Sequence, residues 1–507
     1  MLPQTQRYRK LEIRLMTSQE TTFRHAKNDF IFLSEKEKNV NEKLCNSMTY
    51  YGPLEILDNV YTLQKFPCQY GWEYPGRRKT IVSEYDLVCD KTWLVAAAQA
   101  VFFLGQLFGA VLFSQIFADK FGRRFSFLLS VNIMVASGCA TVFAVNLSIF
   151  MLLYFIQGFG QISSFLCIFR LFMELIGPTA RTKVGFVVYT SFGLGFFALS
   201  VMAYLIEDWQ HLELALSIPW VIYAAYWWLI PESPKFFLMQ RRFYDAEKVI
   251  LKIAYGNNMK PPPHLYTKLE EIANEDAKPK SYAMYDLLRT WRFSKHYLNI
   301  WLNLFVNSLI YYGLVLYSVD LGENPFINVI LFGLIEIPAY LSCFYLSSHL
   351  RPFSFCMITG GVACIIGSLL SQSVSWFSVS LFIIAKLVIA ASHGIINLIC
   401  IEFFPPVVHS VALACCTIAT RLGGIFIPFI LHIRHSAEPI PLLFLGFAGV
   451  ICGGLAFHLP ENGEMPMPKS LSLEYSSTFE RTSERDFEED YAFSGTPAYI
   501  SRPDILY

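Results

Sequence analysis

Charged residues are scarce in this chain. Only 16% of its 507 residues are Asp, Glu, Lys or Arg, whereas a soluble domain carries about 25%. Hydrophobic residues make up 54% of the chain, and the mean hydropathy is +0.41. These values argue against a soluble protein and indicate a polytopic membrane protein. The net charge is zero, which gives no support for a nucleic-acid partner.

Several catalytic signatures are also absent from the sequence. It has no Gly-rich phosphate-binding loop ending in Lys-Ser or Lys-Thr, which argues against an ATP-driven pump. It has no metal-spaced cluster of His and Cys and no nucleophile elbow. We therefore predict neither an enzyme, nor a cofactor, nor a metal site. The first residues are basic and lack an apolar core, so they do not resemble a signal peptide.

The cysteines do not form a dense framework. Cys45, Cys68 and Cys89 lie in the polar N-terminal region, and the other nine of the 12 lie in or near apolar segments. A buried free thiol is expected in the apolar segments. Three cysteines cannot all pair with one another. If the N-terminal region is extracellular and carries a disulfide, one thiol is free or lacks its partner.

Long apolar segments dominate the rest of the chain and predict about eleven membrane-spanning helices, an all-α polytopic fold. The predicted spans are 93–117, 125–145, 147–169, 183–206, 213–230, 297–319, 326–347, 353–372, 374–399, 410–431 and 440–458.

Polar stretches divide these spans into two groups. We expect an extracellular N-terminal region (1–92), a bundle of five spans (93–230), a cytoplasmic linker (231–296), a bundle of six spans (297–458) and a disordered cytoplasmic tail (459–507). The orientation follows from Lys and Arg in the linker, the tail and a short turn at 118–124, which fall on one side if every segment crosses. A secondary transporter is the function that such an arrangement favours.

Polar side chains recur at helical spacing inside several predicted spans. Polar groups in a membrane span are costly, and they usually face a cavity or a neighbouring helix. The candidates for lining a central substrate cavity are Gln157, Gln161, Asn307, Tyr311, Tyr312, Lys386, His393, Asn397 and Arg421. For the amides, hydrogen bonding between helices is an equally weighted alternative. For Lys386 and Arg421 the alternative is a structural ion pair with Glu336, and for His393 it is a bond to a neighbour.

Several motifs resemble those of a known family. The turn Asp119-Lys120-Phe121-Gly122-Arg123-Arg124 is similar to the loop signature of the major facilitator superfamily. Three further motifs resemble the solute carrier family of organic cation, organic anion and carnitine transporters: Leu87-Val88-Cys89-Asp90, Ile230-Pro231-Glu232-Ser233-Pro234-Lys235 and Leu459-Pro460-Glu461. Two motifs are most similar to its carnitine and zwitterion branch: Phe159-Gly160-Gln161-Ile162-Ser163 and Gln240-Arg241-Arg242-Phe243. Two more also match: Glu336-Ile337-Pro338-Ala339-Tyr340 and Glu402-Phe403-Phe404-Pro405.

The resemblance implies a two-bundle transporter fold with twelve helices and transport of small organic ions across the plasma membrane, by alternating access. It also implies a membrane-lipid environment and a coupling ion, Na⁺ or H⁺. Arg421 occupies a position where anion and carnitine members carry Arg, so a carboxylate-bearing substrate is expected. Tyr311 and Tyr312 could face a quaternary ammonium group. A conformational latch is expected from Asp119, Gly122, Arg123, Arg124, Glu232 and Glu402.

The chain also departs from the family pattern. We expect the family's first span to be missing, because nothing before Trp93 is long and apolar enough. Gln115, Tyr154 and His409 replace residues that are usual in the family, and the loop at 347–352 has lost most of the expected charge. A truncated, transport-deficient relative that acts as a membrane interaction or regulatory protein is therefore the alternative function.

Overall fold

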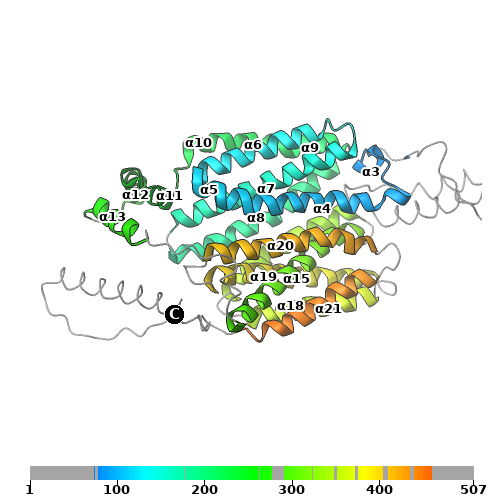
Figure 1. The fold of residues 1–507 in the computed structure, drawn as a ribbon. Coiled ribbons are helices and arrows are strands. Elements are labelled where there is room, and N and C mark those ends of the chain that lie inside the picture. The colour runs from blue at the N-terminus through cyan, green and yellow to red at the C-terminus, as the bar shows by residue number, and fades with distance from the viewer. Residues whose placement is uncertain are drawn as a thin grey trace, which may run out of the picture.

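The fold is a bundle of long helices that run roughly side by side (Figure 1). The structure, a computed structural model, describes residues 74, 78–176, 178–261, 263–276, 291–321, 324–346, 351–370, 375–403, 409–433 and 439–459. Expectations for Cys45, Cys68, the loop at 347–350 and the tail after 459 lie outside these residues, as does the question of a further span before Trp93. In the described part, the only β pairing is an isolated bridge between Lys79 and Asp208.

The first half of the bundle comes from the chain before residue 230. Its elements are α3 (Ile81–Glu84), α4 (Trp93–Phe108), a π-helix (Gly109–Phe117), α5 (Ala118–Phe121), α6 (Arg123–Thr141), α7 (Leu147–Leu175), α8 (Pro178–Leu205), α9 (Trp209–Ser217), a 3-10 helix (Ile218–Ala225) and α10 (Tyr226–Leu229). Local caps define several of these ends. Asn146, for example, accepts a hydrogen bond from the Ile149 amide and so begins α7.

The second half follows a linker that forms α11 (Pro234–Met239), α12 (Phe243–Gly256) and α13 (Leu265–Asp276). The remaining elements are α15 (Trp291–Tyr317), a 3-10 helix (Ser318–Asp320), α16 (Pro325–Leu334), α17 (Glu336–Leu346), α18 (Arg351–Leu370), α19 (Ser375–Phe403), α20 (His409–His432) and α21 (Ile440–Ala456). The break between α16 and α17 has a local cause: Pro338 lacks an amide hydrogen and its ring clashes with the carbonyl four residues earlier.

Within the described residues, nine helices are long and apolar enough to cross a membrane. Two more of the predicted spans are not single helices of this length. Helix α21 is apolar but has 17 residues, and the predicted span 213–230 is a composite of α9, a 3-10 helix and α10. The predicted all-helical membrane fold is confirmed, and its span boundaries hold to within a few residues for most helices.

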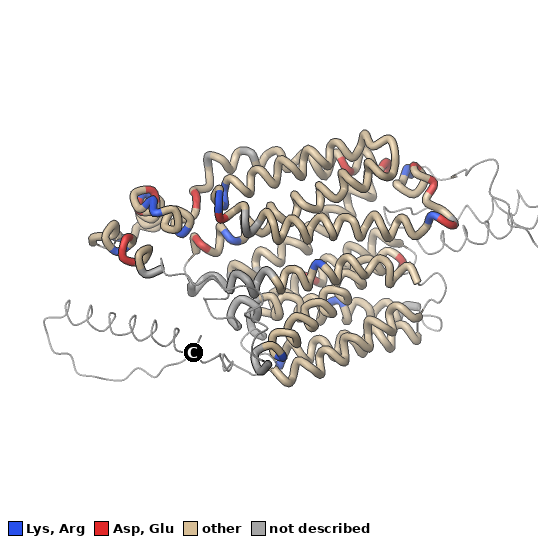
Figure 2. Tube along the Cα trace, in the orientation of Figure 1, with Lys and Arg blue, Asp and Glu red and all other residues tan. Residues whose placement is uncertain are grey.

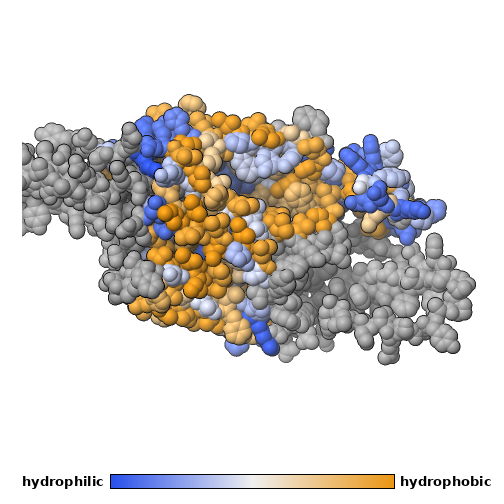
Figure 3. Space-filling view, turned by 180° about the vertical axis from the view of Figure 1, so that it is seen from behind, coloured by the Kyte–Doolittle hydropathy of each residue, from blue (hydrophilic) through white to orange (hydrophobic). Residues whose placement is uncertain are grey.

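Charge is concentrated at the two ends of the bundle (Figure 2). The turn between α5 and α6 lies at the same end as α11 to α13, as the orientation argument requires of two cytoplasmic segments. Between the ends, the view from behind shows a broad apolar surface (Figure 3). The chain is therefore a multi-pass membrane protein with its apolar sides available to lipid.

The two halves meet through an apolar contact and a cation at the end opposite the linker. Ala203 and Leu212 of the first half share a buried cluster with Val319 and Phe326 of the second. The guanidinium of Arg78 lies 4.6 Å from the centre of the Phe326 ring. It also donates to the carbonyl oxygens of Ala203 and Tyr204, at 3.5 Å each. Arg78 therefore connects the last turn of α8 to the first turn of α16.

Candidate functional site

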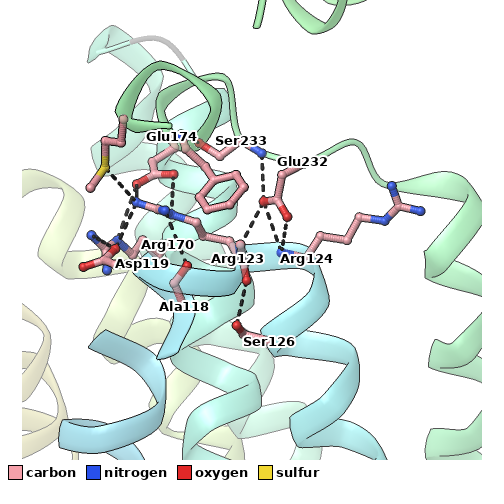
Figure 4. Close-up of polar contacts among 12 residues, drawn as sticks. Ala118, Asp119, Arg123, Arg124, Ser126, Arg170, Glu174, Glu232 and Ser233 are labelled. Carbon is pink, nitrogen blue, oxygen red and sulfur yellow. Dashed lines mark hydrogen bonds and ion pairs between the residues drawn. The ribbon is translucent and has the colours of Figure 1, made fainter. Parts of the chain in front are cut away.

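The turn between α5 and α6 carries a dense group of ion pairs (Figure 4). The side chain of Arg123 is fully buried, and it contacts Asp119 at 3.1 Å and Glu174 at 3.2 Å. Arg170 contacts the same two carboxylates, at 3.0 and 3.4 Å. The turn and the end of α7 thus each contribute one arginine and one acid to the group. The two carboxylates neutralise the Arg123 guanidinium, whose burial without a partner would destabilise the fold.

A second carboxylate fixes the start of α6. Glu232 accepts hydrogen bonds from the backbone amides of Arg123 and Arg124, at 3.0 to 3.2 Å. These are unpaired amides of a helix N-terminus, where a negative charge is favoured. Gly122 makes the approach possible. Its φ is +101°, and a Cβ at this position would lie 3.1 Å from the Glu232 carboxyl carbon.

Five of the six residues of the predicted latch lie close together, and their action as a latch stays a prediction. Asp119, Gly122, Arg123, Arg124 and Glu232 come together at one end of the first half. The guanidinium of Arg124 differs from that of Arg123, because it lies over the Trp227 ring, at 4.5 Å, without a carboxylate partner among the described residues. The side chain of Glu402 lies outside the described part of the chain, so its place in a latch stays a prediction.

Arg421 lies at the contact between the two halves. Its Nη1 atom donates to the amide oxygen of Gln106 on α4, at 2.8 Å, and to the hydroxyl of Tyr312 on α15, at 2.9 Å. Gln106 is itself oriented, because its Nε2 atom donates to Gln161 on α7 at 2.7 Å. Arg421 is therefore held by one partner from each half of the bundle.

This arrangement leaves one edge of the Arg421 guanidinium without a partner among the described residues. Both hydrogens of Nη1 are used by Gln106 and Tyr312. The Nε atom is buried and has no acceptor among the described residues. A guanidinium edge formed by Nε and Nη2 can hold the two oxygens of a carboxylate in a bidentate pair. The Arg421 side chain as a whole is half-buried.

A separate buried ion pair lies within the second half. Lys386 Nζ is 2.6 Å from Glu336 Oε1, and neither side chain has any exposed surface. The Tyr311 hydroxyl donates to the same carboxylate oxygen at 2.7 Å, and Lys386 Nζ also lies 3.6 Å from the centre of the Tyr311 ring. Lys386 thus has the structural ion pair that was the alternative to substrate contact. In this conformation, the Tyr311 ring already holds a cation.

The polar stripe of α19 continues from this pair. The ring of His393 stacks on that of Tyr311 at 4.7 Å, and its Nδ1 atom is 2.9 Å from Asn307 Oδ1. Asn397 donates to the His393 carbonyl oxygen at 2.7 Å. Asn307 is fully buried, whereas His393 and Asn397 are half-buried. Their contacts are bonds to neighbouring groups, and a substrate-binding role for them stays a prediction.

The two glutamines of α7 have different partners, although they lie on one face of the helix. Gln161 bonds to Gln106 toward the contact between the halves. Gln157 instead donates to Glu213 on α9, inside the first half. Helical spacing identified the shared face correctly, and it could not distinguish the two neighbouring helices.

Comparison with known proteins identifies the family. The model of a protein family described as "Sugar (and other) transporter" matches residues 32–463. Solute carrier family 22 member 3 of Rattus norvegicus is 30% identical over 410 residues, which are 80% of this chain and 73% of that protein. The chain belongs to solute carrier family 22. This family assignment confirms the resemblance found in the motifs and makes the chain a transporter, not an enzyme.

A further relative in solute carrier family 22 is the organic cation/carnitine transporter 2 of Rattus norvegicus. It is 30% identical over 420 residues, which are 81% of this chain and 74% of that protein. Because member 3 has the same identity, the comparison does not separate the carnitine branch from the rest of the family. Among solved structures, the proton:xylose symporter XylE matches with a TM-score of 0.60 at 16% identity, over 73% of this chain and 87% of that protein. This match shows the major facilitator fold.

Four polar residues of these networks were not predicted from the sequence as site residues. Arg170 and Glu174 are four residues apart near the end of a long apolar segment, and this spacing was their only signal. Gln106 is a single glutamine in an uncharged segment. Glu213 is an acid at the start of a predicted span. An acid in that position is a stronger signal than a glutamine, because a charge in a membrane span needs a partner.

Proposed function

We propose that the chain is a plasma-membrane secondary transporter whose substrates are small organic ions with a carboxylate, such as carnitine-like zwitterions or organic anions. The observation that carries this proposal is the free guanidinium edge of Arg421. This donor pair has no acceptor in the described part of the chain and lies at the contact between the two halves, and a carboxylate is the ligand that matches its geometry. The name of a relative, organic cation/carnitine transporter 2, supports the same substrate class.

Alternating access requires the halves to separate on one side while the substrate stays bound. Arg421 is hydrogen-bonded to both halves, through Gln106 and Tyr312. A bound carboxylate would therefore sit on a residue whose contacts change when the halves move. This position would couple binding to the conformational change.

Replacement of Arg421 tests the substrate class. In Arg421→Gln, we expect uptake of a carboxylate-bearing zwitterion at low concentration to fall about 10- to 150-fold, since a hydrogen-bonded charged pair contributes about 1.5–3 kcal/mol. Arg421→Asp should abolish that uptake by repulsion. Initial uptake rates in cells, normalised to surface expression, measure both effects. The uncharged ester of the same compound serves as the second substrate.

The ester separates loss of recognition from loss of transport. Uptake of the ester should fall much less than uptake of the acid in Arg421→Gln. Lys252→Gln on exposed α12 is a control for the loss of one positive charge and should leave both rates unchanged. Equal losses for acid and ester would contradict a carboxylate contact at Arg421. Absence of saturable uptake in the unaltered chain would instead favour the transport-deficient alternative.

A further inference from the structure

Glu213 is a carboxylate without a cationic partner in the described part of the chain. Its Oε1 atom accepts hydrogen bonds from Gln157 on α7 and from the Ser217 hydroxyl, the latter at 3.5 Å. Both donors are neutral. A carboxylate removed from bulk water is normally paired with a cation, bound to a metal or protonated. Glu213 therefore lacks the usual compensation for a negative charge.

The described side chains around Glu213 provide no cation that would neutralise its carboxylate. Helix α7 also carries Tyr154, a neutral phenol three residues before Gln157. Helix α6 contributes Gly138, whose missing Cβ would clash with Ser217 Oγ and fall 3.3 Å from Gln157 Nε2, so the glycine makes room for both donors. On α9 itself, the largely exposed His211 pairs with Asp208 at 3.7 Å. The described groups that contact the Glu213 carboxylate, Gln157 and Ser217, are thus neutral hydrogen-bond donors.

Gln157 has an acceptor atom that could receive a hydrogen bond from the O–H group of a protonated Glu213. The Oε1 atom of Gln157 is buried and receives no hydrogen bond from the described residues, although its Nε2 atom donates to the carboxylate. An amide can both donate to and accept from a carboxylic acid. The half-buried Glu213 carboxylate takes up a proton from a hydronium ion in the solvent, which leaves as water, and the O–H bond that forms can donate to Gln157 Oε1. The charge and the orphaned acceptor are then removed together.

We propose that Glu213 and Gln157 form a proton-binding site, and that α7 couples its occupancy to the carboxylate site at Arg421. The route consists of contacts in the first half. Gln157 and Gln161 are one turn apart on α7, Gln161 accepts from Gln106, and Gln106 accepts from Arg421. A shift of α7 on protonation would change how Gln106 holds Arg421. The coupling part rests on the proposed carboxylate function, whereas the proton-binding part does not.

Infrared difference spectroscopy on the purified full chain tests the proton site without any transport. When the pH is lowered from about 8 to about 5, we expect proton uptake by Glu213 to produce the C=O band of a carboxylic acid. We expect one such band to be absent from Glu213→Gln and shifted in Gln157→Leu, which removes the acceptor. Glu207→Gln, an exposed acid two residues before α9, should keep the band. Persistence of the full band in Glu213→Gln would overturn the proposal.

Two further measurements cover sodium and coupling. If NaCl but not choline chloride raises the thermal midpoint at fixed pH, and Glu213→Gln removes this effect, the site binds sodium and the proton assignment is wrong. For coupling, the ratio of carboxylate uptake at the two pH values should differ from one by about fivefold or more in the unaltered chain and approach one in Glu213→Gln. An unchanged ratio would overturn the coupling. Arg421→Gln should keep the infrared band, so failure of the carboxylate site is distinguishable.

Discussion

Replacing Lys386 with Met is expected to destabilise the folded protein by about 3–5 kcal/mol, because it leaves Glu336 as an uncompensated buried charge. The two side chains have no exposed surface, and they are 2.6 Å apart. After the substitution, the carboxylate keeps one hydrogen bond, from the Tyr311 hydroxyl at 2.7 Å. It must then take up a proton or draw water into the second half. Thermal unfolding of the purified protein in detergent measures the loss.

The double variant Lys386→Met/Glu336→Gln is the informative comparison. Removing both charges deletes the ion pair without leaving one partner alone, so most of the stability should return. Lys248→Met, on the exposed surface of α12, controls for the loss of a lysine and should change the thermal midpoint little. If Lys386→Met unfolded at the same temperature as the unaltered chain, the buried pair would not be a stabilising requirement of the fold.

The membrane fold could be predicted because its constraints act on long stretches of sequence. A span needs about 20 consecutive apolar residues, and this signal survives local irregularities such as the break at Pro338. The boundaries of the composite α9 to α10 segment were less predictable. There, a 3-10 helix of eight residues connects two short α-helices, and hydropathy alone does not distinguish these backbone forms.

The polar sites were predicted as helix faces and only in part as contacts. The spacing of Gln157 and Gln161 predicted a common face, but the structure gives them partners on α9 and α4. The ion pair of Lys386 with Glu336 was one of two alternatives, since sequence spacing does not measure distance between helices. Gln106 was missed because a single amide in an apolar segment has no periodic signal, although it holds Arg421 at 2.8 Å.

Arg123→Met is expected to have a destabilising effect of similar size, about 3–5 kcal/mol, at the other charged centre of the molecule. Arg123 is fully buried, and its guanidinium bridges Asp119 and Glu174. After its removal, Arg170 remains as the cation for both acids. It cannot replace the buried one, since its side chain is 33% exposed and enters from α7. The thermal midpoint in detergent is the measurement.

The neighbouring arginine provides a matched control. Arg124 has the same side chain one position later in α6, and its guanidinium contacts the Trp227 ring, at 4.5 Å, in place of a carboxylate. Arg124→Met should therefore cost about 0.5–1 kcal/mol, the size of a cation–π contact near a surface. Arg123→Lys should fall between the two, because an ammonium group keeps the charge but cannot bridge two carboxylates as a planar guanidinium does. If Arg123→Met and Arg124→Met lost equal stability, the positive charge of the turn would account for the effect. The bridge from Asp119 to Glu174 would then not contribute to stability.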